Sequence, residues 1–178
     1  MTRLTPRAKG FTIVELAIVV AIIAILVTIT IVAYSEIKRR AQVSALATGL
    51  SQVDKSFRMW ALKEALVTWP TDKVFDTGGG IPLSEFIQNT PTIQPYLSEV
   101  PKVNGIHTEE WFYDNDNDSR ANCTNTYNGT NIVIRYVKDA RVGQLLDEQM
   151  DDGNLTCGRV RYADERIFYS LSFSTKVE

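Results

Sequence analysis

Three acidic residues at alternate positions of the 178-residue chain are the first candidates for chemistry. The stretch WFYDNDNDSRANC places Asp114, Asp116 and Asp118 two residues apart, so that their carboxylates could surround one hard cation in a loop. Calcium is the cation that suits such oxygen ligands best. An EF-hand loop is only half matched, because Ser119 and Asn125 stand where that template has glycine and glutamate. We therefore expect either a calcium site or a solvated acidic turn.

The remaining polar residues do not predict a catalytic site. His107 is the one histidine of the sequence and has no nucleophile near it, so we expect a surface position for it. Adjacent acids at 109–110 and 151–152 need not face each other, and we expect them to be solvated in loops. Phosphate-binding loops and nucleophile elbows do not occur in the sequence. The sequence therefore predicts a protein that is not an enzyme and requires no cofactor, calcium aside.

The two cysteines, Cys123 and Cys157, lie in polar, turn-rich sequence rather than in a CxxC or histidine-rich context. Their spacing does not fit a metal site or a thioredoxin-type redox motif. If the domain is exported, one disulfide between them is the simplest account, closing a loop of roughly 35 residues and stabilising the fold by about 3–4 kcal/mol. In a cytosolic protein the alternative is two unpaired thiols.

A long apolar stretch near the N-terminus organises the chain. From Phe11 to Tyr34 the one charged residue is Glu15, and a helix of that length reaches about 36 Å, enough to cross a hydrocarbon core of about 30 Å. The stretch is longer than the core of a secretory signal and lacks its cleavage pattern. A basic leader over 1–10 favours a cytoplasmic start, so we expect a single membrane span with the body outside.

The charges of the chain are unevenly distributed. The first ten residues carry three of the 19 basic residues and none of the 21 acidic ones. The whole chain has a net charge of −2, so the rest of it stands at −5. Because nucleic-acid binding depends mainly on clustered positive charge, we predict no specific nucleic-acid partner.

Glu15 needs an explanation, because an acid near the start of a membrane helix is costly and usually marks a contact with an opposite charge. No basic residue lies within the apolar run. Cleavage between Gly10 and Phe11 would create an α-amino group close to the level of Glu15 on a neighbouring chain displaced along the helix axis. We interpret Glu15 as the partner of that amine. The alternative is an interfacial glutamate that reaches the lipid headgroups.

The stretch KGFTIVELAIVVAIIAIL resembles the class III signal of type IV prepilins and the related pseudopilins. The matching features are the basic leader, Gly10 before the scissile bond, Phe11 as the new N-terminus, and Glu15 within an apolar helix. The resemblance implies a prepilin peptidase that cleaves after Gly10 and methylates the amine of Phe11. It also implies a filament with stacked hydrophobic helices at its core. In the family, the acid that matches Glu15 is associated with recruiting and registering each incoming subunit.

Two positions depart from the family pattern. Many members have glycine where this chain has Ala24 and proline where it has Val32. Those helix breakers allow local melting of the helix in assembled filaments. Without them, we predict a helix that stays more continuous in the filament, although the β-branched residues over 28–32 lower its propensity in water.

Periodicity in the rest of the chain predicts an α+β fold, in which the long N-terminal hydrophobic helix packs on a small antiparallel β-sheet as in pilins. The helix continues beyond the apolar stretch, with Trp69-Pro70 as its latest end. Its second half has an apolar stripe of Val43, Leu46, Leu50, Val53, Phe57, Trp60 and Ala61. Alternating β-branched and aromatic residues predict strands within 130–138, 158–162 and 166–174, and a helix lies between the first two, over 141–150.

The expected domains are a cleaved leader over 1–10, the long helix over 11–69, and an extracellular α+β head over 70–178. The resemblance implies a structural subunit of a type IV pilus, first a single-pass protein of the cytoplasmic membrane and then part of an extracellular filament. Its implied partners are further copies of the subunit, the prepilin peptidase, the pilus assembly platform and, before assembly, the membrane. The alternatives are a pseudopilin of a type II secretion or DNA-uptake system and a membrane-anchored, calcium-dependent binding domain that does not polymerise.

Overall fold

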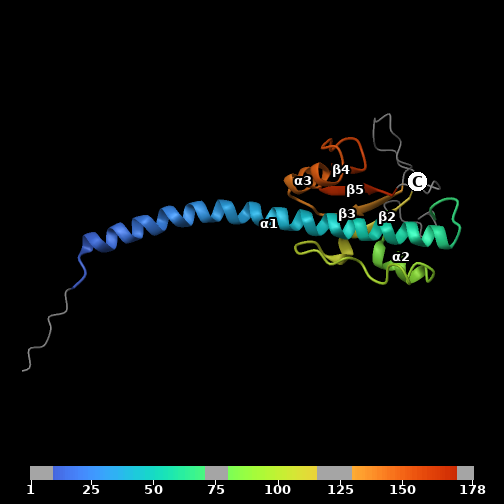
Figure 1. Cartoon of the computed structure of the whole chain (residues 1–178), viewed down its shortest axis with the longest axis horizontal. Helices are drawn as coiled ribbons and strands as arrows, with labels where there is room; N and C mark the ends of the chain where they lie inside the picture. The colour runs from blue at the N-terminus through green and yellow to red at the C-terminus, as the bar shows by residue number, and fades with distance from the viewer. Residues whose placement is uncertain (1–9, 71–79, 116–129, 172–178) are drawn as a thin grey trace, which may run out of the picture. The chain divides into compact units, whose positions relative to one another are not determined.

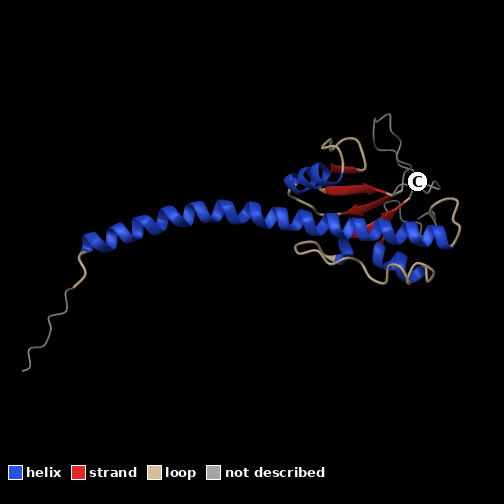
Figure 2. Ribbon diagram, viewed as in Figure 1, coloured by secondary structure: helices blue, strands red, loops and turns tan. Residues whose placement is uncertain are grey.

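The computed structural model describes residues 10–70, 80–115 and 130–171, whose elements are shown in Figures 1 and 2. In chain order these are α1 (Ile13–Lys63), β1 (Ile81–Pro82), α2 (Leu83–Asn89), the 3₁₀ turn η2 (Thr108–Glu110), β2 (Trp111–Asp114), β3 (Asn131–Ile134), α3 (Ala140–Met150), β4 (Val160–Ala163) and β5 (Arg166–Ser170). The contacts divide the chain into an N-terminal unit, Met1–Lys38, and a C-terminal unit, Arg39–Glu178. The long apolar helix and the small antiparallel sheet confirm the predicted α+β class.

Within the N-terminal unit, α1 is a regular helix that passes through Ala24 and Val32 without interruption. Two threonines in this part donate hydrogen bonds to backbone oxygens one turn earlier, Thr28 to Ala24 at 2.8 Å and Thr30 to Leu26 at 2.7 Å. These bonds satisfy the hydroxyl groups on the helix itself, so neither threonine needs a polar neighbour. Continuity of the helix in an assembled filament stays a prediction.

The C-terminal end of α1 lies at Lys63, before the limit set by Trp69-Pro70. Ala65 has a positive φ of 50°, and the Leu66 N–H donates a 2.9 Å hydrogen bond to the Ala61 carbonyl. A left-handed residue followed by a bond of this kind is the Schellman motif, which satisfies a carbonyl that the helix leaves without a partner. The helix therefore stops through its own backbone geometry.

The sheet has the strand order β1-β2-β3-β5-β4, and every neighbouring pair is antiparallel. β3, β4, β5 and α3 confirm the elements predicted for the C-terminal third. β1 and β2 were not predicted. They fall outside the segments in which periodicity predicted strands, and they are only two and four residues long. Strands this short are defined by pairing with their neighbours rather than by their own periodicity.

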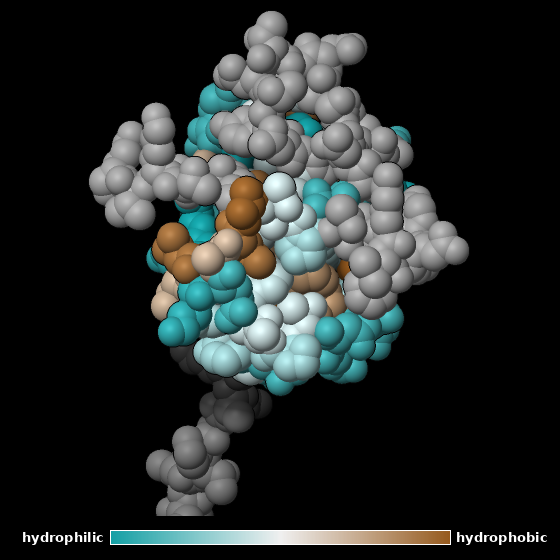
Figure 3. Space-filling model, turned by 90° about the vertical axis from the view of Figure 1, so that its right-hand side faces the viewer, coloured by the Kyte–Doolittle hydropathy of each residue, from teal (hydrophilic) through white to brown (hydrophobic). Residues whose placement is uncertain are grey.

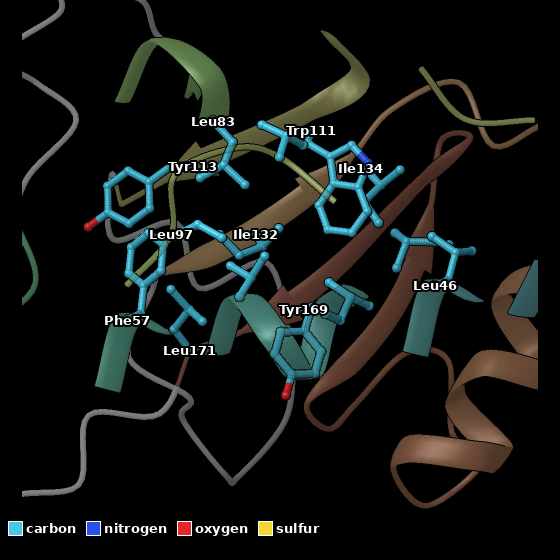
Figure 4. Packing of buried hydrophobic residues seen from close by; sticks show 14 of the residues in the cluster. Leu46, Phe57, Leu83, Leu97, Trp111, Tyr113, Ile132, Ile134, Tyr169 and Leu171 are labelled. Atoms are coloured by element: carbon cyan, nitrogen blue, oxygen red, sulfur yellow. The ribbon is translucent and has the colours of Figure 1, made fainter. Parts of the chain in front are cut away.

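The core of the C-terminal unit lies between the second half of α1 and one face of the sheet. Every member of the predicted stripe is at most 9% exposed. Figure 4 shows Leu46 and Phe57 of α1 in the same cluster as Ile132 and Tyr169 of the sheet. Phe57 stacks on both Phe86 and Tyr113, with ring centroids 5.6 Å apart in each pair. The burial of each large side chain contributes about 1.5–3 kcal/mol, so this face of α1 stabilises the unit.

The contacts of α3 fix it beside β4. Asp139 caps its first turn by accepting a 3.0 Å hydrogen bond from the Arg141 N–H, and it also pairs with Arg39 at 2.8 Å. Gly143 lies directly against the ring of Tyr162, where an added Cβ would come within 2.7 Å of a ring carbon. Glycine is therefore required for α3 to approach β4 this closely.

Candidate functional site

The peptide bond between Gly10 and Phe11 lies just before α1. Gly10 is exposed, with no heavy atom within 4 Å of an ideal Cβ position, and Phe11 is 82% exposed. The bond thus lies in open backbone within the described part of the chain. A protease could approach it without unfolding a packed element.

Glu15 closes a capping box with Thr12 at the start of α1. The backbone N–H of Thr12 donates to Glu15 Oε2 at 2.9 Å, and the Thr12 hydroxyl donates to the same oxygen at 2.8 Å. In return, the Glu15 N–H donates to Thr12 Oγ1 at 3.2 Å. This reciprocal arrangement satisfies N–H groups that a helix start leaves unpaired. This local role of Glu15 was not predicted, although threonine followed three residues later by glutamate is the usual signal of a capping box.

The apolar part of α1 is exposed on all sides. None of its most hydrophobic window is buried within the structure, and even its least exposed large residues, such as Val19 and Val27, are 46% and 49% accessible. The helix is long and apolar enough to cross a membrane. By contrast, the face of the C-terminal unit shown in Figure 3 is mainly hydrophilic or neutral, with hydrophobic residues in small groups. The extended apolar surface of α1 therefore has to be covered by lipid or by other apolar chains.

The structure covers only part of the other predicted sites. Asp114 lies at the end of β2, half-buried, whereas Asp116 and Asp118 fall outside the described residues. Cys157 lies half-buried between α3 and β4, and Cys123 also falls outside the described ranges. The calcium loop and the disulfide both stay predictions.

A second acidic group was not predicted as a site. One carboxylate oxygen from each of Asp147, Asp151 and Asp152 lies within 4.8 Å of the others. Asp147 is on the buried side of α3, and the other two begin the loop that follows it. The spacing of four residues between Asp147 and Asp151, which is one helical turn, was the available signal. The expectation of freely solvated acids at 151–152 is wrong for Asp151, whose Oδ2 accepts hydrogen bonds from the N–H groups of Arg159 and Val160.

The histidine and the acids near it have a structural role. His107 is exposed, and its backbone N–H donates a 3.0 Å hydrogen bond to Glu110 Oε2. Glu110 thereby closes the short turn η2 that leads into β2. This contact involves backbone rather than the imidazole ring, in agreement with the predicted surface position of His107.

Comparison with known proteins gives two relatives and one motif. Residues 5–31 match the prokaryotic N-terminal methylation motif, and this range contains Gly10, Phe11 and Glu15. The type IV major pilin protein PilE of Neisseria gonorrhoeae is 37% identical over 103 residues, which cover 56% of this chain and 54% of that protein. The type IV major fimbrial protein FimA of Dichelobacter nodosus is 36% identical over 77 residues, which cover 40% and 49%.

The chain thus spans about half the length of the curated relatives that it matches. A search of solved structures found no significant match. The matched motif lies at the site built by Gly10, Phe11 and Glu15, and the long apolar helix with its small antiparallel sheet has the pilin arrangement. The chain therefore carries the prokaryotic N-terminal methylation motif and is similar to type IV pilins over about half of its length.

Proposed function

We propose that this chain is a structural subunit of a type IV pilus, inserted in the cytoplasmic membrane, cleaved after Gly10 and polymerised through α1. The observation that carries the proposal is an exposed apolar helix whose start presents Glu15 next to an open Gly10–Phe11 bond. The relatives named as a major pilin and a major fimbrial protein favour a pilus over a secretion pseudopilus.

The exposed surface of α1 suits two environments in turn. Before assembly, lipid would cover the apolar side chains of the N-terminal unit, and the basic leader would hold its start on the cytoplasmic side. After assembly, the same side chains would pack on the α1 helices of other copies. Each state buries the surface that the isolated chain exposes, so transfer from membrane to filament needs no refolding of this part of the helix.

The capping box leaves Glu15 able to make a contact between subunits. Both bonds from Thr12 end on Oε2, and within the described ranges no hydrogen bond to Oε1 is formed. A carboxylate oxygen that keeps its lone pairs can accept from an ammonium group. The amine of a cleaved Phe11 on a neighbouring copy is the donor we propose, because cleavage is what creates a positive charge at this level.

Mass spectrometry of sheared surface filaments from the native cell tests this function. We expect a mature N-terminus at Phe11 that carries one extra methyl group. A chain that stays in the membrane fraction with residues 1–10 intact would contradict the proposal. Long surface filaments would indicate a pilus, whereas a processed subunit without them would indicate a pseudopilin.

Substitution at Glu15 tests the pairing of subunits. Glu15→Gln keeps the shape and the Thr12 bonds but removes the negative charge, so we expect processing to continue while filament yield falls at least tenfold. Glu64→Gln, a matched change at an exposed position just beyond α1, should leave the yield unchanged. Normal filament yield from the Glu15→Gln chain would argue against a charge pair between subunits.

A further inference from the structure

The acidic group at the C-terminal end of α3 has the geometry of a ligand set. It comprises Asp147 on the helix and Asp151 and Asp152 in the loop that leads to β4, with one oxygen from each within 4.8 Å of the others. The two elements that this loop joins, α3 and β4, lie side by side (Figure 1). Three carboxylates at such distances repel one another unless a cation or a proton lies between them.

Asp147 supplies a second, independent observation. Its residue is 0% exposed, and neither of its carboxylate oxygens has a hydrogen-bond partner. Buried polar atoms almost always have partners, and a buried carboxylate without one costs several kcal/mol. Because its oxygen faces those of Asp151 and Asp152, the missing partner belongs at the centre of the three acids.

The neighbouring positive charge is already engaged elsewhere. The guanidinium of Arg159 pairs with Asp54 Oδ1 at 2.8 Å rather than with the acidic group. In the described part of the chain, the donors that reach the group are backbone N–H groups: those of Arg159 and Val160 donate to Asp151 Oδ2, and that of Asn154 donates to Asp152 Oδ1. Burial, followed by the charges of Asp151 and Asp152, raises the pKa of Asp147 to about 6.

We propose that Asp147, Asp151 and Asp152 bind one calcium ion. Calcium accepts six to eight oxygen ligands in flexible geometry, and carboxylates of one short helix-to-loop segment, completed by water, match that preference. Magnesium requires a stricter octahedron and keeps more of its water, so it fits a half-buried loop less well.

The loop is built to hold this conformation. Gly158 has a φ of 106°, and a side chain there would collide with Asp151 Oδ2. Asp152 Oδ1 accepts a 2.9 Å hydrogen bond from the Asn154 N–H, which sets the turn of the loop beside α3. Both acids of the loop are thus oriented by backbone contacts, while Asp147 is fixed by the helix. The site lies in the C-terminal unit and does not depend on the proposed filament function.

Calcium titration of the full chain in detergent tests the proposal. After treatment with chelator, we expect calorimetric heat on adding calcium. We also expect Tm to rise by about 5–10 °C at a concentration roughly 100 times the dissociation constant. Neither heat nor a Tm rise in the unmodified chain would overturn the site. An equal response to magnesium would overturn the assignment to calcium.

Two variants and a control locate the ion. Asp147→Asn should abolish the calcium response while leaving Tm in chelator unchanged or higher, because the substitution removes a buried charge. If that variant fails to fold, Asp152→Asn at the exposed edge should weaken the response at least tenfold. Asp164→Asn, in the exposed turn between β4 and β5, is the matched control and should respond normally. A full response in both ligand variants would reject the site.

A further variant separates this site from the acidic loop after β2. Replacement of Asp114, Asp116 and Asp118 by asparagine should leave the calcium-induced Tm rise in place. Loss of the rise in that variant, with a retained response in Asp147→Asn, would assign the calcium to the other loop.

Discussion

The two halves of α1 use similar apolar residues in opposite ways. In the N-terminal unit, residues such as Ile22 and Leu26 are 52% and 58% exposed, and they occur all around the helix. In the C-terminal unit, residues such as Leu46 and Leu50 are fully buried, and they form a single stripe. One continuous helix thus serves two kinds of environment, because the distribution of apolar residues around it changes along its length.

This difference allows substitutions that affect the stability of the folded subunit to be distinguished from those that affect its assembly. Stripe residues of the C-terminal unit stabilise the folded subunit, and their loss should be measurable on the isolated chain. Exposed apolar residues of the N-terminal unit gain burial only from lipid or other chains. Changes there should affect membrane insertion and assembly while leaving the folding of the C-terminal unit alone.

The largest expected effect comes from Phe57. Phe57→Ala removes a 0%-exposed ring that stacks on Phe86 and Tyr113, so we expect a loss of about 3–5 kcal/mol in the free energy of unfolding. Denaturant unfolding of the full chain in detergent measures this free energy. The matched change Ile22→Ala should stay within about 0.5 kcal/mol. Equal losses for the two variants would break the comparison between the halves of α1.

A smaller loss is expected from adding a methyl group to α3. Gly143→Ala places a Cβ within 2.7 Å of the Tyr162 ring, and separation of α3 from β4 should cost about 1–3 kcal/mol. Gly49→Ala on α1 meets Pro101 and Trp111 at 3.1 and 3.2 Å, so a shift of a few tenths of an ångström suffices and the loss should be smaller. Thermal unfolding followed by circular dichroism compares the loss of stability in the two variants. A greater loss at Gly49 would contradict the tighter packing assigned to α3.

The cap of α3 gives a pH-dependent effect. Asp139→Ala removes the acceptor for the Arg141 N–H and should cost about 1 kcal/mol. The bond from Arg39 lowers the pKa of Asp139, helped by the backbone bond from Arg141, although burial opposes the shift. A lowered folded pKa means that this stabilisation is complete above the unfolded value of about 3.9 and is lost as pH falls through the folded value.

Thermal unfolding across pH checks this assignment. The Tm difference between the unmodified chain and Asp139→Asn, which retains a cap acceptor but loses the charge, should be constant near neutral pH. It should shrink as pH falls below the unfolded value and disappear once Asp139 is protonated in the folded state. A difference that persists in acid would show that the charge of Asp139 does not contribute through Arg39.

The smallest effect on unfolding is expected at the start of α1. Thr12→Ala breaks the capping box with Glu15, which should fray the first turn without changing the unfolding of the C-terminal unit. Hydrogen exchange at the amides of Val14 to Leu16 should become faster in detergent, while Tm stays within about 1 °C. A fall in Tm comparable to that of Gly143→Ala would contradict the assignment of this cap to the first turn of α1 alone.

Much of the fold was predictable because its signals are local. The stripe from Val43 to Ala61 has helical spacing, and the alternation around Ile132 and Tyr169 has strand spacing, so burial followed directly from periodicity. β1 and β2 could not be found in this way. Ile81–Pro82 is too short to show a period. Gly80, with a φ of 82°, leaves room for the neighbouring strand, since a Cβ there would lie 2.8 Å from the carbonyl oxygen of Tyr113 in β2.

The candidate sites also differ in whether their signals in the sequence are local. The sequence by itself was enough to predict a site at Gly10, Phe11 and Glu15. Its signal is local, because the basic leader, the cleavage position and the acid in the apolar run follow one another in the chain. Only the tertiary structure decided that Asp147 is buried without a partner and faces Asp151 and Asp152. The physical reason is that the burial of Asp147 and its distance from the other two acids depend on how α3 packs beside β4. The identity and order of these residues in the chain do not reveal that packing.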